Sequence, residues 1–158
     1  MLGFGKSVSQ TKVTFARNVY EPGSTIKIKI ECDNSQCSCE VKAFKIKLQR
    51  KWVGFAGTTQ YRSSKYLLEV KLPGVGGHKT LNECVNFELP KVNKFYDAEK
   101  PYSKLLSSSV NGCLISIQYY LRFFIKHSSM TEFGEGHCIT MPLWIQQPYM
   151  SLETQVEQ

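Results

Sequence analysis

Hydrophobic and polar positions alternate with a period of two along most of this chain, and the alternation is longest in GCLISIQYYLRFFIK, residues 112–126. Its odd-numbered positions from Ile115 to Ile125 are almost wholly apolar. A period of two with many β-branched and aromatic residues indicates a long, half-buried strand. Residues 128–136 contain two glycines and are typical of a turn, so CITMPLWI, residues 138–145, is predicted to return as a second strand. Pro142 cannot donate a ladder hydrogen bond, which predicts a sheet edge or a bulge there.

Five further strands are predicted ahead of this hairpin, over residues 11–16, 24–32, 40–52, 61–72 and 80–89. The clearest is STIKIKIEC, where three isoleucines alternate with charged residues. In EVKAFKIKLQRKW, residues 40–52, the apolar parity changes, which predicts a bulge near Ala43.

Turns or loops are predicted over residues 19–24, 33–36 and 54–59, and a long polar connection over 90–111. About seven strands without a convincing helical segment predict an all-β, two-sheet sandwich. We expect the core to depend on five residues on the apolar parity of their strands: Ile28, Ile46, Tyr119, Leu121 and Trp144.

The length of 158 residues suits one domain. We expect a β-sandwich domain over residues 11–147, with a flexible lead-in over 1–10 and a disordered tail over 148–158. No apolar run approaches the roughly 20 residues that span a bilayer, and the first ten residues hold no secretory signal. A cytoplasmic location is therefore expected, with peripheral membrane association left open, and the six cysteines should be reduced thiols.

The net charge of +7 is unevenly distributed. Residues 1–79 hold 14 basic and 5 acidic side chains, whereas residues 80–158 hold 6 basic and 8 acidic ones. A basic half suggests an anionic partner, such as a phospholipid, a phosphorylated tail or nucleic acid, although a solvated outer face of strands explains the charge equally well.

Metal and catalytic chemistry find little support in the spacing of the candidate side chains. Cys32, Cys37 and Cys39 are separated by four residues and then by one, and no second cysteine pair follows, even if His78 or Cys84 took part. There is no G-x-S-x-G motif, and none of the three histidines lies in a recognisable nucleophile motif. We therefore expect no metal, no cofactor, no catalytic residues and no enzymatic activity.

The order and spacing of these segments resemble the C-terminal domain of the arrestin family. VYEPGSTIKIKIECDNSQCSCEVKAFKIKLQRKW, residues 19–52, is similar to the family's Pro-Gly turn, alternating strand, Asn-Ser turn and lysine-rich strand. The likeness continues at FELP, residues 87–90, at SSSVNGCLISIQYYLRFFIK, residues 107–126, and at ITMPLWI, residues 139–145. It covers roughly residues 11–147.

The resemblance implies an immunoglobulin-like β-sandwich of about seven antiparallel strands. It also implies a non-enzymatic cytosolic adaptor or scaffold that binds cytoplasmic tails of membrane proteins or trafficking proteins, in protein transport, endocytosis or signalling. The family's N-terminal sandwich is not in these residues, so an excised domain or a one-domain member is expected. One alternative is a retromer-type coat subunit. The other is a basic module that binds lipid or nucleic acid, and of these two ligands we expect lipid rather than nucleic acid.

Some arrestins bind inositol phosphates through basic residues on two strands that match residues 41–50 and 117–126. By this resemblance, two of the family's basic positions are basic in this chain as well, as Lys45 and Arg122. Gln49 occupies a position where the family commonly has a basic residue.

Alternation alone places Lys45 and Lys47 outward on one strand, and Arg122 and Lys126 outward on another. If these strands are neighbours, the four cations lie on one surface, which we call the basic face. Because like charges repel, the basic face should favour an anion such as a phosphoinositide head group or an inositol phosphate.

Overall fold

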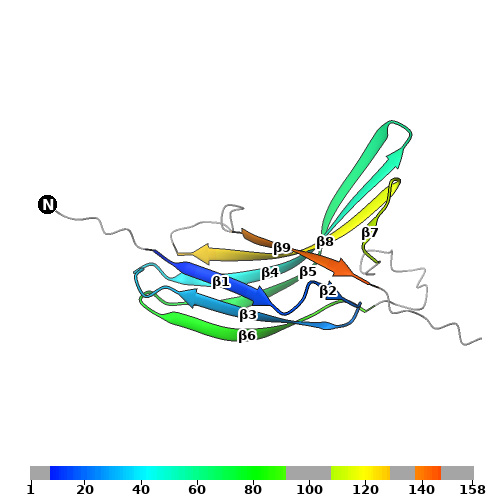
Figure 1. The fold of residues 1–158 in the computed structure, drawn as a ribbon. Coiled ribbons are helices and arrows are strands. Elements are labelled where there is room, and N and C mark those ends of the chain that lie inside the picture. The colour runs from blue at the N-terminus through cyan, green and yellow to red at the C-terminus, as the bar shows by residue number, and fades with distance from the viewer. Residues whose placement is uncertain (1–7, 92–107, 129–137, 147–158) are drawn as a thin grey trace, which may run out of the picture.

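The computed structural model describes residues 8–91, 108–128 and 138–146, and the described residues form nine strands and no helix (Figure 1). The strands are β1 (Gln10–Phe15), β2 (Val19–Tyr20), β3 (Thr25–Asp33), β4 (Val41–Ala56), β5 (Thr59–Val75), β6 (Thr80–Glu88), β7 (Val110–Asn111), β8 (Ile115–His127) and β9 (Cys138–Ile145).

The strands form two sheets that pack face to face (Figure 1). The smaller sheet has the order β1-β3-β6, and the larger has the order β2-β9-β8-β4-β5, with β7 paired to β8. Each pairing is antiparallel except that of β2 with β9. Seven of the nine strands have six residues or more, so the prediction of an all-β sandwich of about seven strands is confirmed.

The core lies between the two sheets and is built from the inward parity of three long strands. Ile26, Ile28 and Ile30 of β3 are buried on the smaller sheet. The larger sheet contributes side chains from β4 and β8, and the rings of Phe44 and Phe123 lie 5.3 Å apart between centroids. Four of the five residues expected to form the core, namely Ile28, Ile46, Tyr119 and Leu121, are buried.

The fifth expected core residue, Trp144, is 44% exposed, so that expectation was wrong. Alternation along β9 sends Leu143 and Ile145 inward, and both are buried. The intervening side chain must then face outward, because successive residues of a strand point to opposite faces. The expectation placed Trp144 on the apolar parity of its strand, but the buried residues Leu143 and Ile145 define the inward parity of β9.

The predicted bulge near Ala43 is present, because the register of β4 against β8 shifts between Val41 and Ala43. Pro142 lies opposite Tyr120 of β8, and the other flank of β9 pairs with β2 only at the last two residues of β9. The proline therefore lies where its missing N–H removes no described strand pairing, as an edge position requires.

Two predicted connections are shorter than expected. The expected loop over residues 54–59 is instead a tight hairpin, in which β4 continues to Ala56, β5 begins at Thr59, and Gly57 takes a φ of +60°. The expected turn over residues 19–24 begins with the short strand β2.

The hairpin of β4 and β5, together with the start of β8, projects beyond the smaller sheet; Figure 1 shows it as the teal, green and yellow strands at the upper right. We call this projection, residues 50–66 and 115–118, the arm. Residues 59–66 of β5 are all exposed. Among the described residues, the smaller sheet therefore does not cover the inner face of the larger sheet along the arm.

Several predictions fall wholly or mainly outside the described residues. They concern most of the lead-in, most of the long connection, the turn before β9 and the tail, which correspond to residues 1–7, 92–107, 129–137 and 147–158. Within the lead-in, Gln10 already belongs to β1.

Candidate functional site

The structure places the four residues of the basic face on neighbouring strands. β4 pairs with β8 so that Lys47 lies opposite Arg122, Lys45 lies opposite Phe124, and Lys126 lies opposite Ala43. The parity of these cations is opposite to that of the core residues of both strands, so they lie on the outer face of the larger sheet. These core residues are Phe44, Ile46 and Leu48 on β4, and Tyr119, Leu121 and Phe123 on β8. Whether this surface binds an anion stays a prediction.

Glu69 of β5 lies beside the basic face and pairs with two of its lysines. Its two carboxylate oxygens lie 3.1 Å from Lys45 Nζ and 3.1 Å from Lys47 Nζ. Burial alone would raise the pKa of the Glu69 carboxyl, but the hydrogen bonds from the two lysines lower that pKa below its ordinary value. One carboxylate therefore offsets part of the positive charge of the basic face.

Aromatic rings fill the space between the cations. Lys47 Nζ lies 4.6 Å from the centroid of the Tyr66 ring, and Arg122 Cζ lies 5.0 Å from that of Phe124. Arg122 also donates hydrogen bonds from Nη1 to Tyr66 Oη, at 2.8 Å, and from Nε to Cys138 Sγ, at 3.3 Å. Burial would lower the pKa of Arg122, but the contacts with Cys138 and Tyr66 raise it, so the guanidinium stays charged in an ordered network.

Two residues near the basic face have environments that sequence reasoning did not predict. Phe124 has the outward parity of its strand but is only 5% exposed, because the basic side chains of its neighbours lie over its ring. Gln49 is also buried, and its Nε2 donates a hydrogen bond to Ser64 Oγ at 2.8 Å. The amide therefore takes part in packing between β4 and β5.

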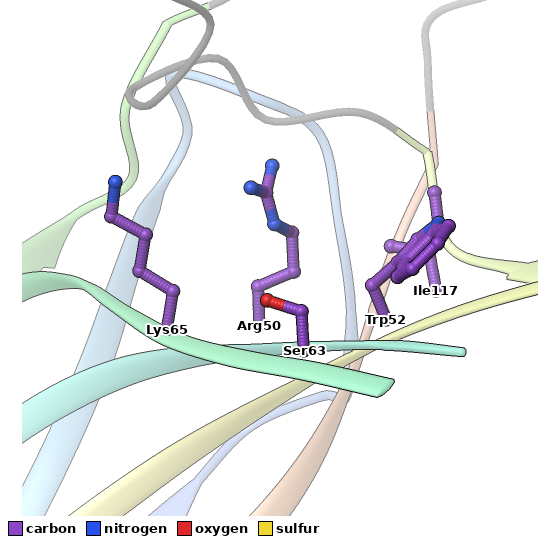
Figure 2. A pocket seen from close by; sticks show the side chains of 5 residues that line it. All are labelled: Arg50, Trp52, Ser63, Lys65 and Ile117. Atoms are coloured by element: carbon purple, nitrogen blue, oxygen red, sulfur yellow. The ribbon is translucent and has the colours of Figure 1, made fainter. Parts of the chain in front are cut away.

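A second candidate site, a pocket of about 390 Å³, lies on the arm, and sequence reasoning missed it. Figure 2 shows its lining residues, which are Arg50, Trp52, Ser63, Lys65 and Ile117.

In this pocket Arg50 lies opposite Lys65, and Trp52 lies opposite both Ser63 and Ile117. The signal was present in the sequence, since Arg50 and Trp52 continue the inward parity of β4. Alternation, however, does not tell where the covering sheet ends.

The cysteine region is an ordered corner of the fold, where the segment after β3 meets the segment before β6. The backbone N–H of His78 donates to the carbonyl oxygen of Cys37, at 2.9 Å, and His78 Nδ1 lies 3.0 Å from the carbonyl oxygen of Ser35. Each of the six cysteines, all within the described ranges, is a free thiol. Over the residues that the structure describes, no group of three metal-ligating side chains is found.

Comparison with known proteins gives one family and one fold. The family model "Arrestin (or S-antigen), C-terminal domain" matches residues 7–148. Among solved structures, Spo0M, a sporulation control protein from Bacillus subtilis, is similar with a TM-score of 0.62 at 8% sequence identity, over 89% of this chain and 50% of that one. The chain thus spans about half the length of that protein, and the likeness shows the fold alone.

No curated protein sequence matches the chain. Within the described part of the chain, no helix is long and apolar enough to cross a membrane.

Proposed function

Because the chain belongs to the family of the arrestin C-terminal domain, we propose that it is a non-enzymatic adaptor or scaffold domain acting at the cytoplasmic side of membranes. It binds cytoplasmic parts of membrane proteins or components of the trafficking machinery, in protein transport or signalling. The observation that carries this proposal is the family match over residues 7–148, a range that includes the nine strands that the structure describes.

The surface of the domain supports a binding role. Residues 59–66 of β5 are exposed along the arm. Large apolar side chains are exposed there too, such as Tyr61 in the arm and Leu114 beside it. Exposed aromatic and aliphatic side chains beside polar ones are typical of surfaces that bind other proteins.

Affinity capture followed by direct binding tests the proposal. The immobilised domain is incubated with a solubilised membrane fraction, and an unrelated β-sandwich of similar size and charge is the control. We expect the domain alone to retain membrane proteins, and synthetic cytoplasmic segments of those proteins to bind the purified domain directly. If no retained protein binds directly, the adaptor proposal is wrong. Retention of coat subunits without membrane cargo would favour the coat-subunit alternative.

Anion binding by the basic face is a second candidate function, favoured by the register that puts Lys47 opposite Arg122. The anion would be a phosphoinositide head group at the membrane or a free inositol phosphate. Each lysine near an anionic surface contributes on the order of 1 kcal/mol, or roughly fivefold in affinity. The ion pairs with Glu69 reduce this effect in the wild type.

Vesicle binding with matched variants tests the anion site. We expect K45Q/K47Q to weaken binding to phosphoinositide vesicles and Glu69→Gln to strengthen it, since the latter removes a carboxylate that pairs with both lysines. Arg122 is kept, because its guanidinium contacts Tyr66 and Cys138.

The control is K12Q/K27Q, which removes the same charge from exposed positions on the smaller sheet. Equal binding by all four proteins would show that the basic face is only a solvated surface. Competition by soluble inositol phosphate separates the head group from the bilayer as the source of the anion.

A further inference from the structure

The pocket on the arm places two cations directly opposite each other, and no ion pair between them and a carboxylate is found in the described part of the chain. Arg50 of β4 pairs in register with Lys65 of β5, and like charges opposite each other on neighbouring strands are destabilising. The sequence contains no Asp or Glu over residues 41–68 or 110–128. An anion supplied by a partner would remove this repulsion.

The other end of the pocket is apolar. The Trp52 indole lies over Gly54, where an added Cβ would come within 2.8 Å of two indole carbons. Ile117 of β8 lies opposite Trp52 and completes this wall, and Figure 2 shows both side chains at one end of the pocket, away from Lys65. Both residues are half-buried, and Gly54 leaves the space in which the indole lies.

The strand beside the pocket has an open edge. β5 is the outermost strand of the larger sheet and pairs, in the described part of the chain, only with β4. Figure 1 shows that the arm stands clear of the smaller sheet. An exposed strand edge presents unpaired N–H and C=O groups, which are a template for pairing with an extended peptide.

We propose that the arm binds an extended acidic peptide of a partner protein, which adds to the edge of β5 as a further strand. A carboxylate of the peptide lies against Lys65 and Arg50, and an apolar side chain crosses Ser63 to reach Trp52 and Ile117. This inference rests on the proposed function, because it names the chemistry of the partner that such a scaffold domain would bind.

The geometry of β5 also determines the spacing and order of the acidic and apolar side chains in the peptide. Lys65 and Ser63 are two residues apart, and side chains on one face of a strand repeat every two residues. The peptide must therefore carry its acidic and apolar side chains two residues apart. The acidic residue comes first if the peptide runs antiparallel to β5, and the apolar residue comes first if it runs parallel. A flat anionic membrane fits less well, because the cations line a recess beside an open strand edge.

The probe is the fluorescent peptide Thr-Leu-Thr-Glu-Thr-Leu-Thr, which satisfies both strand directions, and the readout is fluorescence anisotropy. We expect the wild-type chain to bind it at least fivefold more tightly than the counterpart with Gln in place of Glu. R50Q/K65Q should lose this preference, and the control K12Q/K27Q should keep it. Melting temperatures report whether each variant is folded. A preference that survives in folded R50Q/K65Q, or a wild type without preference, overturns the proposal.

Strand addition is tested separately with a peptide that satisfies one strand direction only, either Thr-Thr-Thr-Glu-Thr-Leu-Thr (antiparallel) or Thr-Leu-Thr-Glu-Thr-Thr-Thr (parallel), whichever binds. It is made in two N-methylated versions, one for each edge. In a strand, alternate N–H groups point to opposite edges, and only one edge faces β5. Methylation on that edge should abolish binding, whereas methylation on the other edge should leave it nearly unchanged. Equal effects of the two peptides would show that the contact is not a strand pairing, and the proposal would fail.

Two further outcomes separate this inference from its alternatives. If phosphatidylserine vesicles bind through Arg50 and Lys65 but the peptide does not bind, the arm is a membrane contact and the peptide proposal is overturned. If R50Q/K65Q captures and directly binds the same membrane proteins as wild type, the adaptor function stands and the arm site fails.

Discussion

Asn34 shows how one buried polar side chain joins distant segments. Its Nδ2 donates to the carbonyl oxygens of Cys39 and Gly76, at 2.9 and 3.0 Å. Its backbone N–H donates to the carbonyl oxygen of Lys79, at 3.0 Å. Asn34→Ala removes both side-chain donors from a fully buried site, so we expect the free energy of unfolding to fall by about 1–3 kcal/mol in urea denaturation. Asn86→Ala, at an exposed position of β6, is the control, and equal losses would contradict the prediction.

Glu69 should make the stability of the molecule depend on pH. Its pKa in the folded state is below the ordinary carboxyl value, because the hydrogen bonds from Lys45 and Lys47 outweigh the effect of burial. A group of this kind stabilises the fold above its unfolded pKa and loses that contribution as the pH falls through its folded pKa. We expect Glu69→Gln to melt below wild type at pH 7, by a small margin for partly exposed ion pairs. The difference should shrink as the pH falls below the ordinary carboxyl pKa of about 4.3 and through the lower pKa of the folded state. A difference independent of pH would assign the effect to packing.

Residue parity was the most reliable part of the sequence prediction, and Trp144 shows how it can be misapplied. The alternation of β3 and β4 predicted the burial of Ile28 and Ile46 and the outward position of Lys45 and Lys47. In β9 the large indole was assigned to the core, although its parity is opposite to that of the buried Leu143 and Ile145 on either side. Hydrophobicity alone does not decide the face of a strand.

At the scale of the elements, strands could be predicted better than their ends. Phe55 and Ala56 continue β4 because they pair with Gln60 and Thr59 of β5, although glycines and threonines in residues 54–59 indicated a loop. The arm was missed for a related reason. Arg50 keeps the inward parity of β4 in a region where the smaller sheet no longer covers it, and the length of the covering sheet is a property of tertiary packing.

The close approach of β5 to β4 gives an element-scale prediction that uses two glycines. An added Cβ on Gly74 would lie 1.7 Å from the carbonyl oxygen of Val41, whereas one on Gly57, at a φ of +60°, would meet nothing within 4 Å. Gly57→Ala should therefore lower the free energy of unfolding by only about 1–2 kcal/mol, which is the cost of holding alanine in the left-handed conformation. Gly74→Ala must also move backbone, so we expect a clearly larger loss in chemical denaturation. Equal losses would show that the two strands separate easily there.

At the scale of the whole molecule, the two cationic surfaces lie on opposite faces of the larger sheet. Lys45 and Lys47 point away from the core, whereas Arg50 and Lys65 lie on the inner face of the arm. Their described interactions share no partner, because Glu69 pairs with the first two only. Sites without shared partners act independently, and at physiological ionic strength the field of an exposed charge decays within about 8 Å.

We therefore expect the two double variants to separate the two activities. K45Q/K47Q should weaken binding to phosphoinositide vesicles and leave the affinity for the acidic peptide within about twofold of wild type, and R50Q/K65Q should do the reverse. The quadruple variant should show the product of the two separate effects, because independent free energies add. Both affinities are measured in the same buffer at about 0.15 M salt. If each double variant weakens both activities equally, the positive charge acts as one field over the whole molecule, and neither surface is a separate site.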